Sequence, residues 1–219
     1  MHHFFKRVFL LLMILPLAGV AGNAQTHVAE DAFTPAPAPQ GIWFRKCDTF
    51  TRRFLYSQTV LWPPTIAAHT FLILRQENFV WEYYFSWNKY RKTFTMPPVW
   101  DSDHWSWNYE VHPYMGSISY LAYRNRRASV AESVLGTALN SFIYEYIIAG
   151  GTQRPSYNDL IVTPVAGSLL GEGLYQIKKR MLRDKHLTRF EKVVLTLTDP
   201  AEVFYFGFNF RKIAANPYR

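Results

Sequence analysis

Six polar residues between positions 112 and 172 have the side-chain types that acid–base or metal chemistry uses: His112, Arg124, Glu145, Ser156, Asp159 and Glu172. A histidine with two or three carboxylates can ligate a divalent metal, or divide acid and base roles between groups with shifted pKa values. If the helices that carry them pack antiparallel, the six groups could converge. We take His112, Arg124, Glu145, Asp159 and Glu172 as candidate catalytic residues. The sequence specifies no metal, and we expect no cofactor.

The same side chains could instead stabilise the fold. Arg124 could neutralise Glu145 or Glu172, while His112 and Asp159 could hold backbone groups at helix ends. Such a buried polar network would fix one packing of the helices without doing chemistry. The sequence also lacks a nucleophile elbow, a His-Glu-x-x-His motif and a phosphate-cradling loop. We therefore predict a structural or binding module, with a hydrolase or transferase acting on a lipid or glycan as the alternative.

A long helix is predicted over Ser129–Gly151. Ser129 and Glu132 have the spacing of a capping box, and Gly150-Gly151 would supply a left-handed stop. Every fourth residue of this helix is polar over one stretch, at Thr137, Ser141 and Glu145. Apolar neighbours surround the glutamate, so we expect it to be buried and paired or hydrogen-bonded.

The most constrained stretch runs from Arg154 to Glu172. Ser156 can cap a helix, and Thr163-Pro164 predicts a restart, with threonine as cap and proline as first helical residue. A helix should then run to about Leu182. Gly167 and Gly171 are four residues apart, which would let another backbone approach closely.

The remaining segments predict shorter helices and loops. Pro113 suits the first turn of a helix over His112–Arg124, which would follow a loop from Met96 to about Val111. Phe54–Leu74 lacks charge, but Pro63 and Pro64 interrupt it, which favours a pair of helices over a membrane span. Asn78–Thr95 could form an amphipathic helix at a membrane surface. Thr188-x-x-Glu191 and Asp199-Pro200 mark two further helix starts, the second helix ending at Gly207.

These segments predict a mainly α-helical single domain of six to eight helices, several of them short, with glycine-lined close packing. The domain should cover residues 42–210 and be followed by a basic tail at 211–219. Before it, residues 25–41 form an Ala- and Pro-rich linker, and residues 1–24 have the basic start, apolar core and small-residue cleavage site of a signal peptide. An uncleaved N-terminal anchor is the alternative.

Composition and charge point to a membrane surface as partner. The chain of 219 residues has a net charge of +8, and ten basic against four acidic residues fall between Tyr175 and Arg219. This bias suits anionic headgroups, and the aromatic content of 17% suits a membrane interface.

Cys47 is the single cysteine, so no intrachain disulfide is possible. We expect no nucleic-acid partner, because export takes the chain out of the cytoplasm. We expect a periplasmic protein associated with the outer rather than the inner membrane, where protein partners are possible.

Several spaced motifs resemble a family of bacterial envelope proteins that share a domain of unknown function, DUF3943. The resemblance covers about Asp101 to Glu172, through HPYMG, YEY and PSYNDLIVTPVAGSLLGE. The matching positions are Asp103, Asn108, His112, Pro113, Gly116, Arg124, Glu145, Ser156, Asp159, Thr163, Pro164, Gly171 and Glu172. The family has no established activity, so the resemblance implies an envelope location and a shared domain and leaves the mechanism open.

Overall fold

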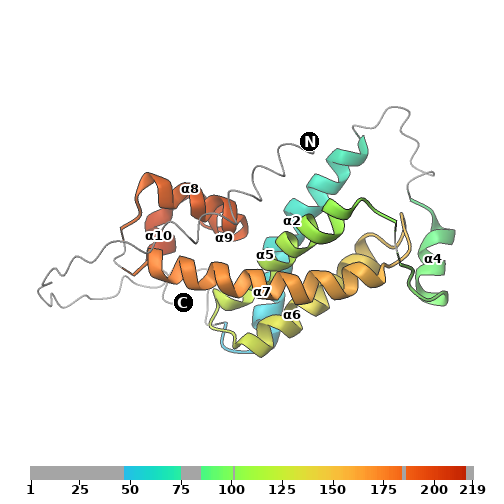
Figure 1. Cartoon of the computed structure of the whole chain (residues 1–219), viewed down its shortest axis with the longest axis horizontal. Coiled ribbons are helices and arrows are strands. Elements are labelled where there is room, and N and C mark those ends of the chain that lie inside the picture. The colour runs from blue at the N-terminus through green and yellow to red at the C-terminus, as the bar shows by residue number, and fades with distance from the viewer. Residues whose placement is uncertain (1–46, 75–84, 101, 184–185, 216–219) are drawn as a thin grey trace, which may run out of the picture. The chain divides into compact units, whose positions relative to one another are not determined.

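The computed structural model describes residues 47–74, 85–100, 102–183 and 186–215. The predicted signal peptide and linker lie outside these ranges. The helices are α2 (Phe50–Leu74), α4 (Trp87–Thr95), α5 (His112–Arg124), α6 (Val130–Ile143), α7 (Tyr157–Met181), α8 (Arg189–Thr198), α9 (Pro200–Tyr205) and α10 (Phe210–Ala214), with π-helical segments η3 (Trp107–Val111) and η4 (Tyr144–Ile148) (Figure 1). The described residues contain no strand beyond one bridge between Val99 and Ser156. The predicted mainly α fold of six to eight helices is confirmed.

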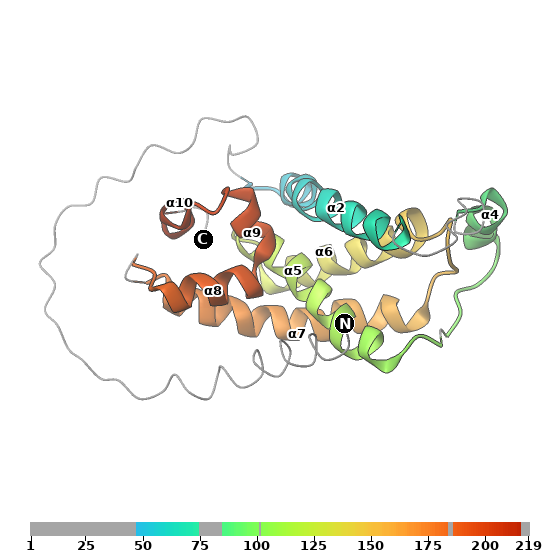
Figure 2. The ribbon, with the colours of Figure 1, turned by 90° about the horizontal axis from the view of Figure 1, so that it is seen from above.

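Helix α5 is the centre of the fold. It contacts α7, α6 and α2, and Figure 2 shows it running between α2 and α7. Its residues from Gly116 to Tyr123 are all buried, and Tyr120, Leu121 and Tyr123 are fully enclosed. Side chains on α5 and on the inner faces of α6 and α7 are therefore enclosed by closely packed neighbours.

Glycines bring α5 and α7 into backbone contact. A Cβ on Gly116 would lie 2.1 Å from the carbonyl oxygen of Thr163, and a Cβ on Gly167 would lie 2.6 Å from the Cα of Gly116. One on Gly171 would meet the ring of Tyr120 at 2.7 Å. The predicted role of Gly167 and Gly171 as packing spacers agrees with these contacts.

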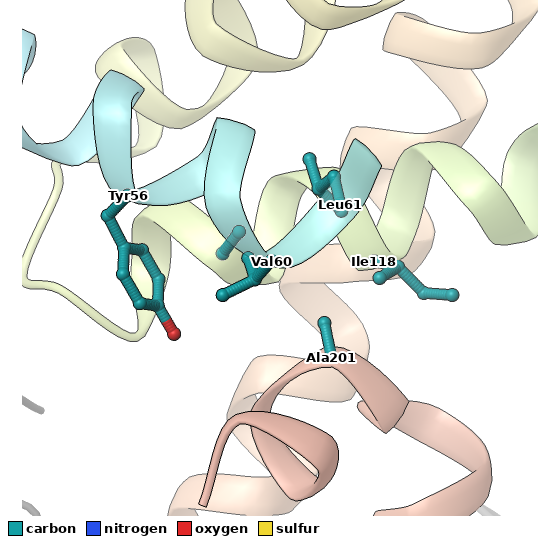
Figure 3. Packing of buried hydrophobic residues seen from close by; sticks show 6 residues of the cluster. Tyr56, Val60, Leu61, Ile118 and Ala201 are labelled. Carbon is teal, nitrogen blue, oxygen red and sulfur yellow. The ribbon is translucent and has the colours of Figure 1, made fainter. Parts of the chain in front are cut away.

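An apolar cluster joins the N-terminal helix to the C-terminal part of the domain. Tyr56, Val60 and Leu61 from α2 meet Ile118 of α5 and Ala201 of α9 (Figure 3). Because its members lie far apart in the sequence, this cluster fixes α2 and α9 on the same side of α5.

Two predicted proline breaks are wrong. Helix α2 continues through Pro63 and Pro64 to Leu74, and α7 continues through Pro164 to Met181. Pro63 and Pro64 are exposed, so their rings meet no packed neighbour, and the residues before them anchor α2 to the core. In α7, close packing of Thr163 and Gly167 on Gly116 flanks Pro164, and the helix continues through the missing donor there. Thr163 is therefore an interior residue of α7 and does not cap a helix.

Two other boundaries also differ from the prediction. The expected loop to Val111 ends earlier, because residues from Trp105 onward are already helical and η3 leads directly into α5. His112 consequently caps no helix.

Gly150 and Gly151 do not adopt a left-handed conformation. They are instead small because Cβ atoms there would meet the Tyr146 carbonyl oxygen at 2.5 Å and the Phe85 ring at 2.3 Å.

The helix starts were predicted more accurately. Ser129 with Glu132 and Thr188 with Glu191 form complete capping boxes, and the side chain of Ser156 accepts a hydrogen bond from the Asp159 amide. Of the predicted amphipathic segment, the described part forms α4, and residues 78–84 lie outside the described ranges.

Candidate functional site

One polar cluster lies where the start of α7 meets the start of α5. The imidazole of His112 is between two α7 side chains: Nε2 lies 3.4 Å from Asp159 Oδ1, and Nδ1 lies 3.2 Å from Thr163 Oγ1. Asp159 is almost fully buried and Thr163 is buried, whereas the His112 side chain is 17% exposed. The order hydroxyl, imidazole, carboxylate is the one in which a histidine can act as a general base.

Glu145 belongs to the same region through backbone contacts. The amide of Ser156 donates a 2.9 Å hydrogen bond to Glu145 Oε2, and the hydroxyl of Ser141 donates to the carbonyl oxygen of Asp159 at 3.1 Å. Glu145 is 1% exposed, which confirms the prediction that this carboxylate is buried. It ties η4 to the first turn of α7.

Tyr144 adds a phenol to this cluster. Burial raises its pKa to about 12, and the nearby carboxylates of Glu145, Asp159 and Asp103 raise it in the same direction. The phenol therefore keeps its proton near neutral pH and can act as a hydrogen-bond donor beside two buried carboxylates.

A second polar cluster surrounds Glu172 on α7. Arg124 donates two hydrogen bonds to its carboxylate, at 2.8 and 3.2 Å, and Tyr120 and Gln176 donate at 2.7 and 2.6 Å. The guanidinium of Arg124 also lies 4.2 Å from the centre of the Tyr175 ring. Of the two partners proposed for Arg124, the structure selects Glu172 over Glu145. These hydrogen bonds all come from side chains of α5 and α7, so the Glu172 carboxylate serves to join the two helices.

This cluster makes stability depend on pH. Partial burial raises the pKa of Glu172, but the hydrogen bonds from Arg124, Tyr120 and Gln176 outweigh it and lower the pKa from 4.5 to about 2. A depressed carboxyl pKa stabilises the fold fully above the unfolded-state value, and this contribution is lost as the pH falls through the folded-state value.

We therefore expect about 1–2 kcal/mol of stability to disappear between pH 4.5 and 2, a figure reduced for partial exposure. Denaturant unfolding at a series of pH values measures this loss. Glu172→Gln should flatten the profile over that window. Asp48→Asn, which removes an exposed ion pair with Arg52, should leave the profile unchanged. Equal slopes for wild type and Glu172→Gln would contradict the assignment.

The five candidate residues fall into two clusters and not into one site. Asp159 and Glu172 are thirteen residues apart on α7, a separation of about 20 Å along the helix. His112 and Arg124 occupy opposite ends of α5. His112, Asp159 and Glu145 therefore gather at one end, and Arg124 and Glu172 pair at the other. The described residues contain no group of three or more His, Cys, Asp or Glu side chains placed to hold a metal ion.

Two buried ion pairs were not predicted. Lys178 pairs with Asp199, and Asn125 binds both, accepting from Lys178 and donating to Asp199 at 2.8 Å each. Lys178 was counted in the basic surplus as if it were a surface charge. The one sequence signal was Asp199-Pro200, which correctly marked the start of α9.

The second buried pair joins Arg126 to Glu202. The closest approach is 3.3 Å, and Arg126 also donates to the Tyr56 hydroxyl at 2.6 Å and stacks over that ring. Both charged side chains are almost fully buried. The three groups come from α2, the turn after α5, and α9, so no local spacing in the sequence could have revealed them.

The outer faces of α6 and α7 are apolar, in contrast to these polar interiors. On α7 every fourth residue from Tyr157 to Leu169 is exposed, and Leu169 is 75% exposed. On α6 the exposed side chains are Val130, Val134, Leu135, Leu139 and Phe142. The buried residues of α6 are Ser133, Gly136, Thr137, Asn140 and Ser141. We name these two exposed sets the apolar face.

The fold and these clusters define a helical domain with a polar, small-residue interior and an apolar face. Residues 97–201 match the family model of the domain of unknown function DUF3943, the family that the spaced motifs predicted. The match contains both polar clusters and the apolar face. No curated protein and no solved structure matches the chain.

Proposed function

We propose that this protein is an exported, membrane-associated component of the bacterial envelope, acting as a structural or binding module. Its apolar face would lie against lipid, while the buried polar network holds α5, α6 and α7 in one arrangement. The observation that carries the proposal is the inverted pattern of α6. All of its buried residues are glycine or polar, and its exposed residues include five large apolar ones.

Water disfavours such a pattern, because apolar side chains gain free energy by leaving it and polar groups lose free energy by burial. Lipid reverses the preference. Helices in a bilayer pack through small residues and are joined by hydrogen bonds between polar side chains, with large apolar residues facing the acyl chains. Asn140 shows this type of contact, donating to Ser119 at 2.9 Å and accepting from Gln58 at 2.8 Å.

Helix α7 has the dimensions that this proposal needs. Among the described residues, it is the helix long and apolar enough to cross a membrane, with 25 residues, of which a stretch of 18 has a mean hydropathy of 1.2. Its length of about 37 Å exceeds the roughly 30 Å of a bilayer's hydrocarbon core. In that stretch 39% of the residues are buried within the fold, while Ile161, Val165 and Leu169 are exposed and available to lipid. The length and composition of α7 act together with the inverted burial of α6.

A second candidate is an envelope hydrolase or transferase that acts on a lipid or glycan. The observation in its favour is the order Thr163, His112, Asp159, in which the imidazole lies between a hydroxyl and a carboxylate. In such a site His112 would take the proton of the hydroxyl, and Asp159 would stabilise the resulting imidazolium. The hydroxyl is buried in the second turn of α7, however, beside the Gly116 contact, where a substrate has little access.

One set of variants separates the two candidates. Val165→Glu with Leu169→Glu places charges on the apolar face, at side chains 57% and 75% exposed. Each charge in the hydrocarbon costs about 3 kcal/mol, so the two together should lower the fraction that resists carbonate extraction by at least about a hundredfold. Thr163→Val removes the hydroxyl at nearly constant volume and should leave membrane association and complementation of a deletion strain intact.

Gln153→Glu is the matched control, since it adds a carboxylate at an exposed site away from the apolar face. It should behave as wild type in both assays. If the double glutamate variant stays with the membrane after carbonate, the proposed membrane contact is wrong. If Thr163→Val keeps its thermal stability yet loses complementation, the catalytic candidate replaces the structural one.

A further inference from the structure

The turn after α9 holds a phenylalanine in an unusual backbone conformation. Gly207 and Phe208 have φ angles of 58° and 59°. The amide of Phe208 donates to the Val203 carbonyl and that of Gly207 to the Phe204 carbonyl, both at 2.9 Å, which is the Schellman pattern. That pattern calls for a left-handed glycine at Gly207 only. A second left-handed residue with a bulky side chain is strained, and glycine or asparagine would fit better.

The strained residue presents its ring to the outside. Phe208 is 48% exposed and Phe204 is 63% exposed, and their rings pack edge to face with centroids 5.1 Å apart. The core beneath is complete without them, because Leu195, Val203 and Ile213 are fully buried there. Neither ring is therefore needed to fill the core. Strain that persists at an exposed position indicates a function for the side chain.

The fold separates the charges around this turn. Two acidic residues of the region, Asp199 and Glu202, are buried in pairs with Lys178 and Arg126. A third, Glu191, is engaged in the capping box with Thr188 at the start of α8. The basic residues at the surface are Lys179, Arg180, Arg183, Arg189, Arg211 and Lys212. Burial of the acids in interior pairs thus leaves a cationic surface beside exposed aromatic rings, a combination suited to anionic lipid headgroups.

Helix α8, in the same part of the chain, has a similar composition. Phe190, Val193 and Leu197 are exposed and share one face of the helix by their spacing, while Val194 and Leu195 face the core. Arg189 is exposed at its start. A basic helix with an exposed apolar stripe is typical of segments that lie in the headgroup region.

We propose that the turn between α9 and α10 inserts Phe204 and Phe208 into the headgroup region of an anionic bilayer, with Arg211 and Lys212 binding the phosphates. This inference rests on the proposed membrane location. It adds a second contact and a lipid class, since the apolar face of α6 and α7 would bind neutral and anionic bilayers alike.

Vesicle flotation of the full chain tests the inference, with phosphatidylcholine alone and with 30% phosphatidylglycerol added. Wild type should bind the anionic vesicles about thirtyfold more tightly, given two basic residues near the surface. Arg211→Gln with Lys212→Gln should remove that increment. Phe208→Asn should weaken binding to anionic vesicles about fivefold without lowering the midpoint of thermal unfolding, because asparagine tolerates the left-handed conformation.

The outcomes distinguish this inference from the proposed function. Phe94→Asn removes another exposed phenylalanine, 55% exposed on α4, and should leave the increment unchanged. The inference is overturned if both the Phe208 variant and the double glutamine variant still bind anionic vesicles more tightly than neutral ones to the same extent as wild type. This holds even if neutral vesicles still bind. If wild type does not bind neutral vesicles, the proposed function is overturned. An effect of Phe208→Asn seen in native envelope membranes but not in vesicles would assign the turn to a protein partner and also overturn the inference.

Discussion

Replacing Gly116 with alanine should lower the free energy of unfolding by about 3 kcal/mol or more. The new methyl group would lie 2.1 Å from the Thr163 carbonyl oxygen, 3.0 Å from the Cα of Gly167 and 3.1 Å from the Thr163 carbonyl carbon. All three are backbone atoms, so no side chain can turn aside, and α5 and α7 must separate. A loss of this size corresponds to a fall in Tm of about 6–12 °C for a chain of this length, measured by circular dichroism in detergent.

Gly173 on α7 offers the matched control. A Cβ there would meet no atom within 4 Å, so alanine costs no contact and improves helix propensity. Gly173→Ala should therefore keep the stability or raise it by up to about 1 kcal/mol. If Gly116→Ala and Gly173→Ala have the same Tm, the close approach of α5 and α7 is wrong.

Lys178→Met should cost about 3–5 kcal/mol, as breaking a buried ion pair leaves an uncompensated charge. The charge left behind is the carboxylate of Asp199, which is completely enclosed. Asn125 would also lose the ammonium that donates to its side-chain oxygen at 2.8 Å. Chemical denaturation at neutral pH measures the loss.

Two further variants test this explanation. Lys179→Met changes the next residue, which is exposed, and should alter stability by less than about 0.5 kcal/mol. Combining Lys178→Met with Asp199→Asn should recover part of the loss, because no charge then remains buried and an amide can still accept from Asn125. A double variant that is less stable than Lys178→Met alone would show that the ion pair is not the cause.

Local chemistry in the sequence predicted the helix starts, because a cap depends on residues three positions apart. Ser129 with Glu132, Thr188 with Glu191, and Ser156 with Asp159 all form as expected. The errors fall where tertiary contacts override local preference. Pro164 does not end a helix, because the glycine contact with α5 holds α7 together around it.

The candidate site was predicted in part for the same reason. Periodicity placed Glu145 inside, and the pairing of Arg124 with Glu172 was one of two options that charge alone allowed. The five residues do not converge. The sequence predicted a break at Pro164, but α7 is continuous, and Asp159 and Glu172 therefore lie far apart along one helix. Arg126 and Glu202 are 76 positions apart, so no pattern within one helix could have joined them.

The positions of the two interior ion pairs also bear on the order in which the domain can form during synthesis. Arg126 and Lys178 leave the ribosome before their counter-charges, which arrive with Asp199 and Glu202 at the start of α9. A chain that lacks Asp199 and Glu202 has no acidic partner for these two interior cations, so we expect that its helices do not close around them. We therefore expect closure of the bundle to require α9, and a chain interrupted before Pro200 to stay open.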